Sequence, residues 1–120
     1  MRGLPVALAD LDEKTWQGQV VQLAKQMGWR VYHPLRSKGS APGWPDLSLA
    51  RDRLILLELK RESGKLSDAQ QDWIRALLQA KVEVYVCRPR HLDELARILQ
   101  ARERSLVTSL EAETRLLVGL

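Results

Sequence analysis

Two acidic residues and a lysine stand in an order that suits hydrolysis of phosphate esters. Asp46 follows Pro45, and Glu58 and Lys60 come after a stretch that is otherwise largely apolar. Proteins hold Mg²⁺ through one or two carboxylates together with water. A lysine beside such a cation can orient a nucleophile and offset the negative charge that develops on phosphorus. This chemistry requires the three side chains to meet at one place in the fold.

The elements that carry these residues have the pattern of two β-strands. Segments 46–50 and 54–60 are rich in leucine, and a tight turn over 51–53 joins them. In the second strand, Leu56 shares a face with Glu58 and Lys60, while Leu57 and Leu59 occupy the other face. Because both faces begin apolar, we expect a central strand whose charges arrive at the rim of the core.

The turn length sets which residues of the two strands face each other. A three-residue turn pairs Ala50 with Leu54 and Asp46 with Glu58, on the same side of the sheet. Two carboxylates about 5 Å apart would repel by about 3 kcal/mol at an effective dielectric of about 20. A divalent cation between them reverses the sign of this interaction. A two-residue turn would shift the pairing by one residue and weaken the argument.

The remaining pattern predicts an α/β fold with the element order α-β-β-β-α-β-α, a mixed sheet flanked by helices. Gly28 suits the end of the first helix, and the second helix begins with the capping-box pattern of Ser67 and Gln70. The tail, 105–120, has no clear period. We expect strands over 29–33, 46–50, 54–60 and 82–87, and a first helix over 12–27. A second helix begins at Ser67 and has Trp73, Ala76, Leu77 and Ala80 on one face. A third helix covers 92–103, with Leu95, Ile98 and Leu99 on its inward face.

Further residues are placed to assist the acidic pair. Glu13 falls on the inward stripe of the first helix and could supply a third carboxylate, and Gln70 could hold the lysine or the attacking water. A long loop over 34–45, uncommon in compact domains, precedes Asp46. Candidate contacts to nucleic-acid phosphates lie in this loop and after the second strand of the hairpin: Arg36, Lys38, Ser40, Arg61 and Lys65.

Each of these residues also has a structural interpretation. Asp46 could be a plain loop-to-strand residue, and Glu58 with Lys60 could form an ion pair on an exposed strand, although the apolar residues before them argue against exposure. Glu13 could favour the positive end of its helix. Gln70 could act only in capping, as its position after Ser67 allows.

The aromatic residues, His33 and Cys87 fit structural roles. Trp16, Trp29 and Trp73 have the spacing of core residues. Trp44 could stack on an unpaired base or cover the core, and we favour the core. His33 is interpreted as a histidine at the sheet edge and Cys87 as a buried strand residue.

Composition limits the class of protein. The chain has 120 residues, a formal net charge of +4 and one cysteine, which excludes an intrachain disulfide and a cysteine-based zinc cluster. Its length fits one domain. The positive charge favours polyanionic partners. With no apolar run of about 20 residues and no secretory signal, we expect no membrane contact and a cytoplasmic protein.

The ordered motifs resemble those of a known family. Pro45-Asp46, followed after a hairpin by Glu58-Leu59-Lys60, is the signature of PD-(D/E)XK nucleases, and its surroundings resemble the VRR-NUC (virus-type replication-repair nuclease) branch. The resemblance covers roughly 12–90, with a C-terminal helix and tail over 91–120. The matching pieces are Glu13 with Trp16-Gln17 and Val20, Gly28-Trp29, Tyr32-His33, Gly43-Trp44-Pro45-Asp46, Glu58-Leu59-Lys60, Gly64-Lys65-Leu66-Ser67, Gln70 with Trp73, Val84-Tyr85-Val86 and Arg88-Pro89.

This resemblance implies a restriction-endonuclease-like core and a DNA endonuclease. It implies Mg²⁺ or Mn²⁺ held by Asp46, Glu58 and the backbone carbonyl of Leu59. Stand-alone members, many of them carried by phages and acting in the host cytoplasm, are similar to dimeric enzymes that cut branched DNA such as four-way (Holliday) junctions. We therefore expect a homodimer. The alternatives are a restriction-type, flap, single-strand or RNA nuclease, a non-catalytic DNA-binding module that keeps the fold, and an α/β protein with no nucleic-acid role.

Overall fold

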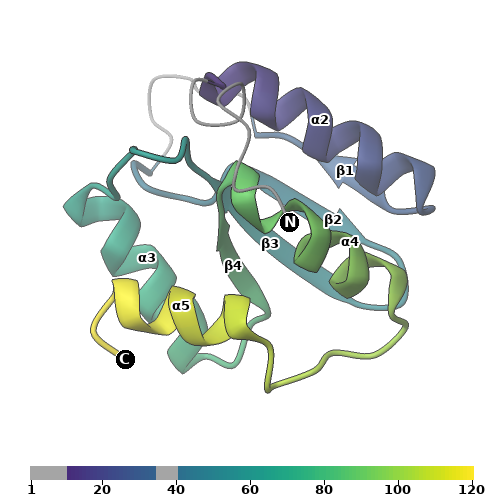
Figure 1. Ribbon diagram of the computed structural model, residues 1–120. Helices are drawn as coiled ribbons and strands as arrows, with labels where there is room; N and C mark the ends of the chain where they lie inside the picture. Colours follow the sequence, from purple (N-terminus) through teal and green to yellow (C-terminus); the bar gives the residue numbers. More distant parts are fainter. Residues whose placement is uncertain (1–10, 35–40) are drawn as a thin grey trace, which may run out of the picture.

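A four-stranded mixed sheet forms the centre of the computed structural model, which describes residues 11–34 and 41–120. The strands lie in the order β1-β2-β3-β4, antiparallel except for the parallel pair β3 and β4. The predicted α/β class with a mixed sheet flanked by helices is therefore confirmed (Figure 1). The elements run α2 (Glu13–Gln26), β1 (Arg30–Tyr32), β2 (Leu47–Ala50), β3 (Leu54–Leu59), α3 (Asp68–Gln79), β4 (Val84–Cys87), a 3-10 turn (Pro89–His91), α4 (Leu92–Gln100) and α5 (Ser109–Leu117).

Helices cover the two faces of the sheet unequally. On one face α2 and α4 form the larger core with the inward residues of β2, β3 and β4, among them Trp16, Leu57 and Leu99. On the other face α3 and α5 pack over β3 and β4, around Leu56 and Ile74. Figure 1 shows α3 and α5 together at the β4 side of the sheet, away from β1.

The predicted register of the hairpin is confirmed. Ala50 pairs with Leu54 and Leu47 with Leu57, so the three-residue turn is the one present. The arginines of the turn tie it to two helix ends. Arg51 donates to the carbonyl of Met27 after α2, at 2.9 Å, and Arg53 donates to the carbonyl of Ile98 in α4, at 3.1 Å. These bonds satisfy helix-terminal carbonyls that have no partner within the helix.

The predicted inward face of the second helix is wrong by part of a turn. The buried residues of α3 are Ile74, Leu77 and Leu78, whereas Ala76 and Ala80 are exposed and Trp73 is half-buried. The ring of Trp73 packs edge-on against Trp44, with centroids 4.9 Å apart. Trp44 itself is 39% exposed, so the prediction that it covers the core is also wrong. Gly43 and Trp44, shortly before Asp46, pack on this side of α3, where the sequence pattern had placed the core.

The tail, which the sequence pattern did not place, contains a further helix. Helix α5 follows α4, which ends at Gln100 rather than near Glu103. The predicted element order therefore lacked its last member. The buried positions in and just after α5 include the polar residues Glu111 and Thr114 beside Leu110 and Val118, which explains why no apolar period revealed it. None of the helices in the described ranges is long and apolar enough to cross a membrane.

Candidate active site

Asp46 and Glu58 come together at the rim of the sheet, as the register predicts. Glu58 is fully buried and Asp46 is 9% exposed. The Oδ2 atom of Asp46 accepts a hydrogen bond from the backbone N–H of Leu59, at 2.8 Å. This bond joins the residue before β2 to the end of β3, and so holds the two acids on neighbouring strands.

The electrostatics of this pair favour a bound proton or cation. Burial, and then the negative charge of Asp46, raise the pKa of Glu58 to about 9. The Oε1 atom of Glu58 is buried and accepts no hydrogen bond from the described part of the chain. A buried carboxylate oxygen without a partner is costly. The donor set, two carboxylates at a sheet rim with one oxygen unsatisfied, therefore fits a hard divalent cation.

Gln70 connects the acidic pair to the start of α3. Its Nε2 donates to Oε2 of Glu58, at 3.1 Å, while its Oε1 accepts from the backbone N–H of Ser67, at 2.9 Å. The Ser67 hydroxyl in turn accepts from the backbone N–H of Gln70, which completes the predicted capping box. The sequence left open whether Gln70 caps the helix or serves the site, and the structure shows contacts of both kinds.

Two variants separate these contacts. Both Gln70→Ala and Ser67→Ala remove a capping bond and should cost about 1 kcal/mol of unfolding free energy, measured by denaturant titration. Only Gln70→Ala also removes the donor to Glu58. Because the family resemblance implies a metal ion at this pair, we expect Gln70→Ala alone to weaken Mn²⁺ binding by about 10- to 100-fold, the usual effect of losing a residue that orients a metal ligand. Equal Mn²⁺ affinity of the two variants would assign Gln70 to capping only.

Lys60 and Glu13 both act electrostatically on Glu58. The charge of Lys60 lowers the pKa of Glu58 and that of Glu13 raises it, so both lie within electrostatic reach. Neither forms an ion pair with the described residues. Over 11–34 and 41–120 no three His, Cys, Asp or Glu side chains lie close enough together to hold a metal ion. Glu13 therefore does not complete a three-carboxylate cluster in this arrangement.

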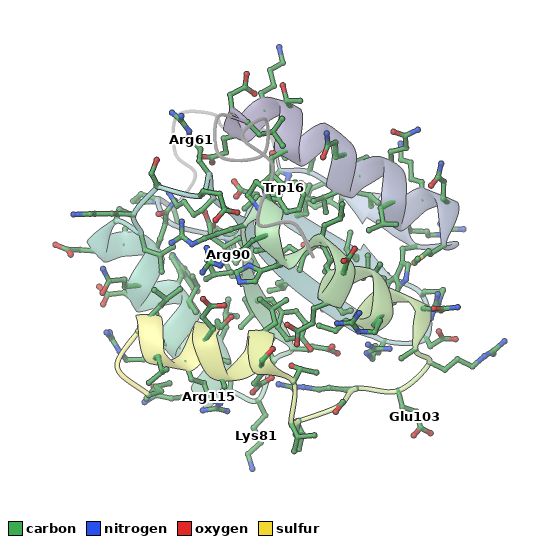
Figure 2. All side chains as sticks on the ribbon, viewed as in Figure 1. Trp16, Arg61, Lys81, Arg90, Glu103 and Arg115 are labelled. Atoms are coloured by element: carbon green, nitrogen blue, oxygen red, sulfur yellow. The ribbon has the colours of Figure 1, made fainter. Side chains whose placement is uncertain are left out.

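The predicted phosphate contacts are only partly within the described residues. Arg36, Lys38 and Ser40 lie outside them. Arg61 and Lys65 are exposed in the segment that follows β3. Figure 2 shows Arg61 directed outward near the beginning of α2. The pKa of Asp12 there is lowered mainly by hydrogen bonds with Thr15, with a smaller contribution from the charge of Arg61. Both cations therefore face solvent, and Arg61 does so at the start of α2.

Arg88, a buried residue, entered the sequence analysis only as part of the family resemblance and was given no role there. One of its guanidinium nitrogens, Nη1, donates to the carbonyls of Arg61 and Gly64, both at 2.6 Å. Arg90 also holds the segment, since its backbone N–H and Nη1 donate to the Glu62 carboxylate. The chain after Lys60 is thus fixed to the end of β4. The available signal was an arginine directly after a wholly apolar strand, where a buried charge needs partners.

The structural interpretations of His33 and Cys87 are confirmed. His33 is exposed beyond β1 at the sheet edge, with its ring nitrogen 3.3 Å from the amide of Gln17. Cys87 is fully buried in β4, and burial raises the pKa of its thiol. Trp16 and Trp29 are core residues as predicted.

A pocket of about 450 Å³ lies beside Trp73, lined by Ala41, Pro42, Ala69, Asp72, Trp73 and Ala76.

Comparisons with known proteins agree with this geometry. The model of the VRR-NUC domain family matches residues 6–91, a range that contains both acids, Lys60 and Gln70. The chain is 38% identical over 53 residues to a Fanconi-associated nuclease 1 homologue of Schizosaccharomyces pombe, a stretch that covers 42% of this chain and 8% of that protein. No solved structure matches. The chain belongs to the VRR-NUC domain family.

Proposed function

We propose that the chain is a divalent-metal-dependent DNA endonuclease, and that Asp46, Glu58 and the backbone carbonyl of Leu59 hold Mg²⁺ or Mn²⁺. The supporting observation is the buried acidic pair, in which Oε1 of Glu58 has no hydrogen-bond partner within the described residues. When bound there, a divalent cation supplies an activated water and stabilises charge on the phosphate. Because the chain belongs to a nuclease domain family, we propose DNA as the substrate of this chemistry.

The residues around the pair divide the remaining work. Gln70 keeps Glu58 oriented through its amide. Lys60, one pleat beyond Glu58 on the same face, can reach the scissile phosphate with its ammonium group. There it would orient the attacking water and offset the additional negative charge of the pentacoordinate phosphorus. The attacking water forms the new P–O bond and gives its proton to solvent, while the bond from phosphorus to the 3′ oxygen breaks and that oxygen takes up a proton from solvent. By resemblance to the family, the products carry 5′-phosphates.

Replacing Lys60 tests this division of work. We expect Lys60→Ala to reduce cleavage by roughly 10²- to 10⁴-fold, with little change in DNA affinity, because its interaction forms mainly in the transition state. The measurement is single-turnover cleavage of labelled four-way junctions, flaps, single strands and plain duplex, with Mg²⁺, Mn²⁺ or EDTA. Equal behaviour of Lys60→Ala and wild type on every substrate would support a non-catalytic DNA-binding module instead.

We further propose that the enzyme acts as a homodimer on branched DNA. One site per chain cuts one strand, so paired incisions need two copies. Large exposed apolar side chains concentrate in the C-terminal tail, at Leu106, Val107, Leu116, Leu117 and Leu120, where they could supply a contact between copies. Light scattering should give a dimer for wild type and a monomer for Leu116→Glu. A monomeric wild type would remove the junction-cutting form of the proposal.

A further inference from the structure

Half of one sheet face has no helix over it in the described part of the chain. Helices α3 and α5 pack over β3 and β4, and the same face of β1 and β2 remains open. Its side chains alternate with buried ones: Val31 packs into the core from the other face, whereas Arg30 and Tyr32 are exposed. We call the set Arg30, Tyr32, Ser48, Ala50 and Leu54 the uncovered sheet face.

The strand register connects this face to the acidic pair. Tyr32 pairs with Ser48, and Ser48 with Leu56. One pleat further along, on the same face, stand Asp46 and Glu58. One pleat in the other direction, Arg30 pairs with Ala50, and Ala50 with Leu54. The acids therefore lie on the same face, between the part that α3 covers at Leu56 and the part of β1 and β2 that it leaves open.

Two large side chains of this face are unusually open to solvent for their apolar content. Tyr32 is 64% exposed and Leu54 is 54% exposed. Arg30 is exposed as well and forms no ion pair with the described residues. An exposed aromatic ring and an exposed arginine that has no acidic partner among the described residues match the surface of a nucleic acid better than an acidic or purely apolar partner.

We propose that the uncovered sheet face binds the DNA strand that flanks the scissile phosphate, with Arg30 on a backbone phosphate and Tyr32 against sugar or base. The inference rests on the proposed nuclease function and specifies its substrate footprint. Pleats on one face are about 7 Å apart along a strand, so Tyr32 and Arg30 lie roughly 7 and 14 Å from the level of the acids, measured along the strands. Across the sheet they are one strand, about 5 Å, from Asp46 and two strands from Glu58. At a rise of about 3.4 Å per nucleotide, these positions correspond to about two and four steps from the cut.

Adding a positive charge distinguishes DNA from a second copy of the chain as the occupant. Leu54→Lys should tighten DNA binding about threefold and increase its salt dependence by about one counterion if DNA lies there. The matched control is Gln22→Lys, the same charge change at an exposed position of α2, which should have a smaller effect. If Leu54→Lys instead leaves DNA binding unchanged and dissociates a wild-type dimer, the face contacts another copy and the proposal is wrong.

Modified DNA tests the contact itself. A neutral methylphosphonate placed at a single position should weaken DNA binding by the wild-type protein about threefold to tenfold wherever the protein contacts that phosphate. About four steps from the cut, the same methylphosphonate should cause no further loss of affinity in the Arg30→Ala variant, because the contact is already absent. Additive effects of the two changes would contradict the proposal. Binding is measured in Ca²⁺ or EDTA, without cleavage. DNA bound but never cut would refute the nuclease function alone, whereas cutting without this coupling would refute the footprint alone.

Discussion

Glu58→Gln is expected to abolish DNA cleavage, by roughly 10³-fold or more, and at the same time to stabilise the metal-free protein. In the folded chain Glu58 keeps its proton up to a pKa of about 9, compared with an ordinary value of 4.5. Between these values the folded state binds more protons than the unfolded state. The free energy of unfolding of wild type therefore falls as pH rises through this window. Glutamine has no such titration and is a poor ligand for Mg²⁺.

Denaturant titrations in EDTA measure the stability part of this prediction. At pH 8 the variant should exceed wild type by on the order of 2 to 4 kcal/mol, and near pH 5 the difference should be small. Glu103→Gln, the same change at an exposed residue (Figure 2), should alter neither cleavage nor the pH dependence. If the unfolding free energy of wild type did not change between pH 5 and pH 8, burial would not raise the pKa of Glu58 as described.

Gly43→Ala is expected to damage fold and site together. Gly43 has φ +91°, and an added Cβ would lie 2.4 Å from the backbone carbon of Ala69 and 2.7 Å from the backbone nitrogen of Gln70. Neither clash can be relieved by a flexible side chain. We expect a loss of about 2–4 kcal/mol of unfolding free energy from strain and displacement. Cleavage should fall as well, because the displaced N-terminus of α3 carries the amide that holds Glu58.

Gly18→Ala is the matched control for this change. Gly18 lies on the exposed side of α2, and nothing stands within 4 Å of an added Cβ. Alanine is the better helix former there and should stabilise the protein by about 0.5–1 kcal/mol. Thermal unfolding of the two variants gives the comparison. If Gly43→Ala melted like wild type, the close approach of the loop to α3 would be relaxed in solution.

The sequence was sufficient to predict the hairpin and the acidic pair. Strand side chains alternate with a period of two, so a three-residue turn left one register that buries Leu47, Leu49 and Leu57 on the same face. That register also brought Asp46 opposite Glu58. The capping box of Ser67 and Gln70 was equally local. These features depend on neighbours in the chain or on one strand pair.

The errors arose where distant segments decide the packing. Trp73 has the spacing of a core residue, yet the loop at Gly43 packs on its side of α3 and pairs it with Trp44. Helix α5 buries Glu111 and Thr114, which Arg104 and the backbone N–H of Val86 satisfy, so apolar periodicity could not find it. Thr108 and Glu111 do have the spacing of a capping box, and the Thr108 hydroxyl caps α5; that local signal was available.

Binding of Mn²⁺ to the metal-free protein tests the central claim most directly. Titration calorimetry in buffers of different ionisation enthalpy reports both the ion bound and the protons released. The proposed site predicts that wild type and Glu103→Gln bind Mn²⁺ and release a proton at pH 7, whereas Glu58→Gln loses this binding. If Glu58→Gln bound the ion as tightly as wild type, or wild type bound none at millimolar concentration, the buried acids would not be a metal site.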